Sequence, residues 1–96
     1  MKSLKEFKNR MRVGAVLKLV HATGAAVANV GVDRPIVESN SVGIALATPV
    51  ADGTTKSSYL NWPKATELLF FGDNKDRFRI DSRGVTMVFE FVQEAA

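Results

Sequence analysis

The period of the sequence changes at Gly14, and this change constrains the fold more than any other feature of the chain. From Gly14 onward, runs of five to nine residues rich in Val, Ile, Thr, Phe and Leu alternate with glycine, proline, asparagine and aspartate. Such runs are typical of β-strands, because branched and aromatic side chains pack well on a pleated surface and the intervening residues favour turns. No segment between the runs is periodic enough for the helical crossovers that a parallel sheet needs. The sequence therefore predicts an antiparallel β domain.

The apolar runs and the turn signals between them predict eight strands. The expected strands cover residues 15–22, 25–30, 35–39, 42–48, 57–61, 67–71, 76–80 and 85–92. The expected turns and loops lie at 23–24, 31–34, 49–55 and 72–75. Asn61-Trp62-Pro63-Lys64 ends one strand, because proline has no N–H for the ladder, and a single helical turn is expected after it. Short strands joined this tightly predict a mainly β fold, either a small antiparallel barrel or a strongly bent meander sheet, in which one short N-terminal α-helix closes one end.

The N-terminal segment carries the only helical pattern. Three apolar residues recur at the spacing of one helix face, and they are Leu4, Phe7 and Met11. Ser3 and Glu6 form a capping box, which marks the start of the helix. Gly14 can adopt the left-handed conformation that follows a helix C-terminus. The sequence therefore predicts a helix over residues 4–12 whose apolar face packs on the sheet.

The last hairpin is expected to follow strict alternation. Phe78 and Ile80 then point into the core, while the arginines between and beside them point outward. A four-residue loop over 81–84 pairs Ile80 with Val85 and Phe78 with Met87.

Length and composition bound the class of protein. A chain of 96 residues falls in the range of one domain, so a single domain over 1–96 is expected. Apolar residues make up 46% of the chain but never run for the roughly 18 positions that a membrane span needs. The absence of cysteine excludes disulfides, a thiolate nucleophile and cysteine-ligated metals.

Charge is distributed unevenly along the chain. Residues 1–18 contain six basic residues and one acidic residue, a net +5, whereas the remainder contains seven basic and nine acidic residues, a net −2. The basic start, the apolar stretch Val13–Val20 and Ala26-Val27-Ala28 together are similar to a secretory signal, but Lys18 and His21 interrupt the apolar stretch. We therefore treat this segment as part of the fold and expect a cytoplasmic protein.

The sequence contains no recognisable catalytic motif. His21 is the only histidine, and alternation puts it on the same face as Leu17 and Leu19, where a structural role is commoner than catalysis. No serine lies in a Gly-x-Ser-x-Gly elbow, and the glycines form neither a dinucleotide fingerprint nor a Walker loop. The acidic residues lack a metal-ligand spacing. We therefore expect a protein that is not an enzyme and that binds neither a cofactor nor a metal.

The remaining candidate residues concern binding. Basic residues on the expected helix and the last hairpin form a candidate surface for phosphate backbones: Lys5, Lys8, Arg12, Arg77 and Arg79. Tyr59 and Trp62 offer aromatic faces for unpaired bases or for a protein partner. The alternative interpretation is that the helix charge is simply solvated, that neighbouring acids neutralise the hairpin arginines, and that both aromatics serve packing.

Three stretches of the sequence resemble small uncharacterised proteins encoded by phages and plasmids. They are Leu4-Lys5-Glu6-Phe7-Lys8 before Val13-Gly14, Arg34-Pro35-Ile36-Val37 leading to Ser39-Asn40, and Trp62-Pro63-Lys64-Ala65. The resemblance implies a mobile-element origin and an accessory or inhibitory binding protein. The expected function is thus a non-enzymatic accessory protein that binds nucleic acid through its basic N-terminal helix. The alternative is a protein-binding module, or an inhibitor of a host defence protein, that uses its sheet surface around Trp62 to contact an acidic protein surface.

Overall fold

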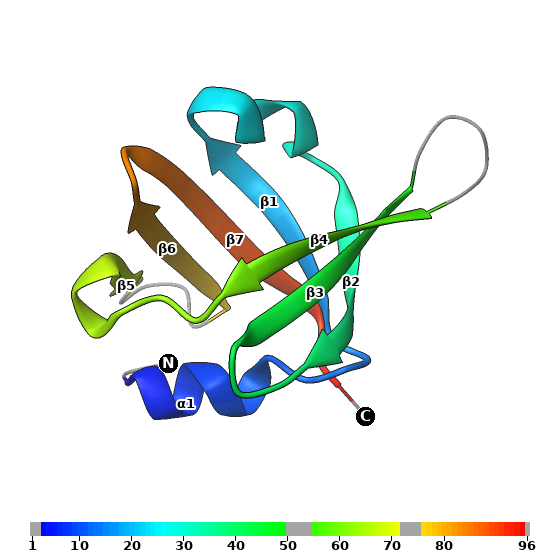
Figure 1. Ribbon diagram of the computed structural model, residues 1–96, viewed down its shortest axis with the longest axis horizontal. Coiled ribbons are helices and arrows are strands. Elements are labelled where there is room, and N and C mark those ends of the chain that lie inside the picture. The colour runs from blue at the N-terminus through cyan, green and yellow to red at the C-terminus, as the bar shows by residue number, and fades with distance from the viewer. Residues whose placement is uncertain (1–2, 50–54, 72–75, 96) are drawn as a thin grey trace.

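The computed structural model describes residues 3–49, 55–71 and 76–95. Seven antiparallel strands form one sheet that curls into a half-barrel, and a short helix, α1, lies across one end of it (Figure 1). The strands are β1 (Val16–Ala22), β2 (Asp33–Ser39), β3 (Gly43–Pro49), β4 (Thr55–Asn61), β5 (Leu68–Phe70), β6 (Arg77–Ser82) and β7 (Val85–Gln93). Their order is β4-β3-β2-β1-β7-β6-β5, so β4 and β5 are the two edges of the sheet. The predicted mainly β fold with one N-terminal helix is confirmed.

Helix α1 (Leu4–Arg10) begins where the capping signal predicts. The Ser3 hydroxyl oxygen accepts a hydrogen bond from the Glu6 N–H at 3.2 Å, and Phe7 on the predicted apolar face is fully buried. The helix is two residues shorter than predicted, because the chain leaves helical geometry at Met11. Gly14, with φ of +103°, lies in the connection to β1 and not at the helix end. Among the described helices, none is long and apolar enough to cross a membrane.

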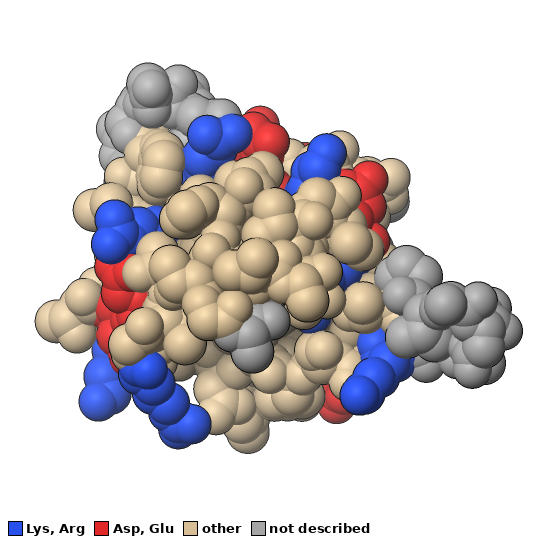
Figure 2. All heavy atoms as spheres, turned by 90° about the horizontal axis from the view of Figure 1, so that it is seen from above, with Lys and Arg blue, Asp and Glu red and all other residues tan. Residues whose placement is uncertain are grey.

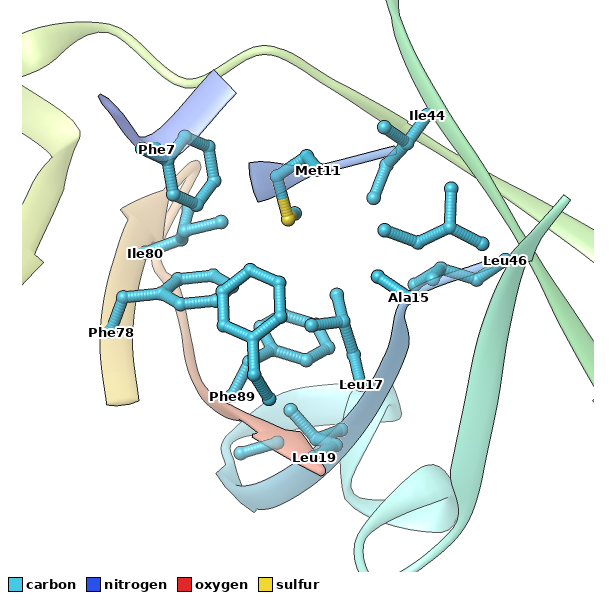
Figure 3. Close-up of a cluster of buried hydrophobic side chains, with 13 residues drawn as sticks. Phe7, Met11, Ala15, Leu17, Leu19, Ile44, Leu46, Phe78, Ile80 and Phe89 are labelled. Atoms are coloured by element: carbon cyan, nitrogen blue, oxygen red, sulfur yellow. The ribbon is translucent and has the colours of Figure 1, made fainter. Parts of the chain in front are cut away.

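The core fills the concave side of the curled sheet and is closed by α1 (Figure 3). Phe7 from the helix meets Phe78 of β6 edge to face, with 4.8 Å between the ring centroids. Phe78 in turn stacks on Phe89 of β7, with centroids 5.5 Å apart. Such aromatic pairs stabilise beyond the area they bury, so the helix is joined to the last hairpin through a continuous set of rings.

The prediction of a strand over residues 25–30 is wrong. These residues lie largely in η1 (Gly24–Asn29), a 3-10 helix that joins β1 to β2. Because β1 and β2 pair directly with each other, the connecting segment must reverse direction, and Gly24 and Gly31 have the positive φ values, +65° and +87°, that bracket this reversal. Val27 of η1 faces outward and is 53% exposed.

The strand break at Trp62-Pro63 and the helical turn after it are confirmed. The turn is η2 (Ala65–Glu67), which runs directly into β5 and leaves that strand only three residues long. The predicted turn at 72–75, and residues 50–54 of the predicted loop, lie outside the described residues.

The last hairpin has the predicted faces but a different register. Ile80 pairs with Met87 and not with Val85, because the loop contains two residues and not four. Arg83 and Gly84 have φ of +51° and +75°. Two successive residues with positive φ are the signature of a tight hairpin turn whose twist matches that of the flanking strands. The shorter loop shifts the pairing by two positions, which preserves the inward face.

His21 lies on the outer surface and not on the inner face with Leu17 and Leu19. The ladder between β1 and β7 shifts between Leu19 and His21, so that His21 pairs with Val88. A bulge inserts one extra residue into a strand and reverses the alternation beyond it. The His21 side chain is consequently exposed.

Candidate functional site

Trp62 directly follows β4 and lies at the junction of the sheet and α1. Its indole N–H donates to the backbone carbonyl of Asn40 at 2.8 Å. Its ring meets Phe7 edge to face, with centroids 6.2 Å apart, and the Lys8 ammonium lies 5.5 Å from its centroid. Trp62 is therefore partly buried and packed, while one cation of the basic helix stands over its ring.

Tyr59 is anchored at the same turn. Its hydroxyl donates to the Asn40 Oδ1 oxygen at 2.8 Å, while the side chain as a whole stays 50% exposed. The same Oδ1 oxygen accepts the N–H groups of Val42 and Gly43 at 2.9 and 3.2 Å. Sequence reasoning missed Asn40 as a site residue, although an asparagine at the start of a turn is a recognised signal for such bonds. Asn40 therefore forms hydrogen bonds with both predicted aromatic residues, Tyr59 and Trp62.

An open groove of about 680 Å³ lies between the Trp62 segment and the hairpin of β6 and β7. Its lining residues are Tyr59, Leu60, Asn61, Trp62, Pro63, Lys64, Glu67, Ile80, Ser82, Arg83, Val85 and Met87. Apolar side chains predominate, and Lys64 and Arg83 supply two cations against the carboxylate of Glu67. The groove has the size and mixed character of a binding site.

The Glu67 carboxylate is held by its surroundings. Its Oε1 oxygen accepts the backbone N–H of Lys64 at 2.9 Å, which lowers the pKa of Glu67 below its ordinary value. A hydrogen bond with Ser82 and the charges of Lys64 and Arg83 lower this pKa further. The carboxylate therefore stabilises the wall of the groove and offsets part of its positive charge.

Of the three cations predicted on the helix, Lys5 and Lys8 lie on α1, whereas Arg12 lies beyond its end at Arg10, so the placement of Arg12 on the helix is wrong. We call these three residues together the basic stripe. Lys5, Lys8 and Arg12 are all exposed, and none of them forms an ion pair with a described residue. Arg10 is different: it binds the carboxylates of Asp76 and Glu94 and lies 4.1 Å from the ring centroid of Phe91. That arrangement ties α1 to the sheet, so Arg10 serves the fold while the stripe faces solvent.

The two predicted hairpin cations are paired with acids. Arg77 lies 3.6 Å from the Glu90 carboxylate, and Arg79 lies 3.0 Å from that of Asp81. A hydrogen bond from Thr86 and a second from Arg79 lower the pKa of Asp81. These pairs favour the interpretation that neighbouring acids offset the charge of the hairpin.

Arg34 is a buried cation that sequence reasoning assigned to a turn. It lies on β2 opposite Leu17, on the inner side of the sheet, and is only 5% exposed. Its Nε–H donates to the Thr48 hydroxyl at 3.0 Å, and the ion pairs among the described residues do not include it. Burial lowers the pKa of Arg34. Its neighbours in the sequence, Asp33 and Pro35, gave no signal for this burial.

Within residues 3–49, 55–71 and 76–95, no cluster of three or more histidine, aspartate or glutamate side chains could hold a metal ion. No protein-family model, curated protein or solved structure matches this chain.

Proposed function

We propose that the protein is a non-enzymatic accessory module of a phage or mobile element that binds nucleic acid in the cytoplasm through α1. The observation that carries this proposal is the position of Lys8, whose ammonium lies 5.5 Å from the Trp62 ring centroid. This contact makes the basic stripe of Lys5, Lys8 and Arg12 continuous with the aromatic wall of the groove. Phosphate-binding cations and a stacking surface are the two components of single-strand recognition, and here they adjoin.

The stripe supplies the electrostatic part of the interaction. Lys5 and Lys8 lie three residues apart on α1, and Arg12 follows the end of the helix. All three side chains are exposed, in contrast to the buried Phe7 and Met11. A phosphate backbone along residues 5–12 would meet three exposed cations without removing any of them from an ion pair with a described residue. Arg77 and Arg79 contribute less, because binding would have to compete with Glu90 and Asp81.

The test is binding of a fluorescent single-stranded oligonucleotide, measured by anisotropy over a salt series. Reversal of Lys5, Lys8 and Arg12 to glutamate should abolish binding at moderate salt, while reversal of Arg77 and Arg79 should weaken it less. The wild-type affinity should fall by roughly one log unit per log unit of salt for each neutralised phosphate. Lys8→Glu and Lys56→Glu form a matched pair, because each reverses one exposed lysine and only Lys8 adjoins Trp62.

Absence of binding at low salt, where the Debye length is about 30 Å at 0.01 M, would overturn the nucleic-acid proposal. A protein partner, bound by the sheet surface around Trp62, would then take its place. The side of η1 offers a second surface for such a partner. Viewed from the side of η1, the middle of the surface is formed by uncharged residues, and charged side chains gather at its margin (Figure 2). Val27 and Val30 on this side are 53% and 40% exposed. A host-lysate pull-down that survives nuclease treatment would support this second candidate.

A further inference from the structure

Strand β4 is a long edge strand with an unbroken ladder. All seven of its residues pair with β3, from Thr55 opposite Pro49 to Asn61 opposite Gly43, without any shift of register. The ladders of β1 with β7 and of β2 with β3 are both interrupted by such shifts. The other edge, β5, contains only three residues. The half-barrel therefore presents one edge long enough to pair with another strand.

The register shows which backbone groups this edge presents. The Gly43 N–H donates to the Asn40 side chain and the Gly43 carbonyl accepts the Asn40 N–H, so the backbone of Gly43 faces β2. In an antiparallel ladder the residue opposite, Asn61, must then point its N–H and C=O away from β3. The period of two extends this to Tyr59 and Ser57. No hydrogen bond to another described residue occupies these backbone groups.

The edge lacks the usual protection against strand pairing. Natural edge strands are blunted by bulges, prolines, several charges or short length. Between 55 and 61 there is no proline and no bulge, and Lys56 is the only charged residue. The side chains from Lys56 to Tyr59 are all exposed. Such an edge strand can form backbone hydrogen bonds with a strand of another molecule.

We propose that β4 pairs with β4 of a second copy of this chain, in antiparallel orientation about a two-fold axis. In the full-length register, each residue i of Thr55–Asn61 pairs with residue 116 − i of the partner. Ser58 then faces its own copy, Ser57 faces Tyr59, and Lys56 faces Leu60. No like charges meet, because the single cation of each strand lies opposite an apolar residue. The strand is thus complementary to itself, as a two-fold interface requires.

The first experiment uses the absence of cysteine from the chain. In the proposed register the two Ser58 residues form a pair without mutual hydrogen bonds, whose Cα atoms lie about 4.5 Å apart, within the range for a disulfide. Ser58→Cys should therefore form a covalent dimer under mild oxidation. Asn61→Cys is the matched control on the same strand, because six residues at about 3.4 Å each separate its two copies by roughly 20 Å. We expect the Ser58 variant to cross-link more than about tenfold faster.

The second experiment removes one donor from the outer edge alone. Ser57→Pro eliminates an N–H that faces away from β3, so the ladder of β3 and β4 keeps its bonds while the partner strand loses one. Sedimentation equilibrium should give the mass of a dimer for the wild type and for Ser57→Ala, and the mass of a monomer for Ser57→Pro. A wild type that is monomeric across the concentration series, or a Ser58→Cys variant that cross-links no faster than Asn61→Cys, would overturn the proposal. The cross-linking comparison decides the matter even where Ser57→Pro does not fold.

Discussion

The indole N–H of Trp62 donates a hydrogen bond to the backbone carbonyl of Asn40, 22 residues earlier in the chain, with 2.8 Å between the two atoms. This bond ties the turn between β2 and β3 to the segment that leaves β4. The Asn40 side chain reinforces the connection by accepting the Tyr59 hydroxyl and two backbone N–H groups. The geometry of the groove therefore depends on a turn residue that does not itself line the groove.

Asn40→Ala should lower the free energy of unfolding by about 1–3 kcal/mol, because it leaves the partly buried Gly43 N–H and the Tyr59 hydroxyl without their acceptor. Urea denaturation followed by Trp62 fluorescence measures this loss. Asn9→Ala, at an exposed position on α1, is the control. A loss for Asn40→Ala within the roughly 0.5 kcal/mol typical of surface substitutions would contradict the role assigned to Asn40.

Phe7→Ala should cost about 3–5 kcal/mol of unfolding free energy, because it removes a fully buried ring and leaves a cavity. Phe7 contacts three rings, those of Trp62, Phe70 and Phe78, so the cavity would lie at the junction of helix and sheet. Thermal and urea denaturation give the value, with Phe7→Leu as the milder comparison. A cost below about 1 kcal/mol would mean that α1 is peripheral to the core.

Arg34→Met should raise the free energy of unfolding by about 1 kcal/mol or more, because an apolar side chain of similar length removes the cost of burying a cation. The residue is 5% exposed, and its Nε–H donates a hydrogen bond to the Thr48 hydroxyl. Thr48→Val is the matched control and should destabilise, since it keeps the charge and removes the acceptor. Destabilisation by Arg34→Met would show instead that the guanidinium itself holds β2 and β3 together.

The acid sensitivity of the protein should decrease when Glu67 is replaced by glutamine. The bond from the Lys64 N–H keeps the pKa of Glu67 below its ordinary value of 4.5. A depressed pKa means that the unfolded chain binds more protons than the folded chain, so this contribution to stability is complete above pH 4.5 and is lost as the pH falls through the folded pKa.

Urea denaturation at a series of pH values below 5 should therefore show a flatter dependence for Glu67→Gln than for the wild type. Asp33→Asn serves as a control, because Asp33 is exposed on β2 and does not line the groove. Equal slopes for the Glu67→Gln variant and the wild type would contradict the assignment.

Several features could be predicted from the sequence because they depend on local chemistry. The start of α1 follows from Ser3 and Glu6, and its buried face follows from the spacing of Phe7 and Met11. The break at Pro63 follows from the missing N–H. Each of these depends on residues within one or two turns of the chain, where capping, periodicity and backbone restriction operate.

The site could be predicted only in part. Residue type alone identified the candidates Lys5, Lys8, Arg12 and Trp62. The contact between Lys8 and Trp62 could not be predicted, because it joins segments more than fifty residues apart in the sequence. The ion pair of Arg77 with Glu90 could not be predicted either. It depends on the two-residue turn, which sets the register that places Glu90 opposite Arg77.

The sequence by itself determined the β class, the single N-terminal helix and the inward face of most strands, because side-chain period and turn chemistry are properties of neighbouring residues. Tertiary structure alone decided the bulge that turns His21 outward, the burial of Arg34 and the hydrogen bond between Asn40 and Trp62. These features arise where strands distant in the chain pair and curl around one core. The packing of whole strands and of α1 sets the register and the burial of these residues. The residues next to them in the sequence therefore do not predict either.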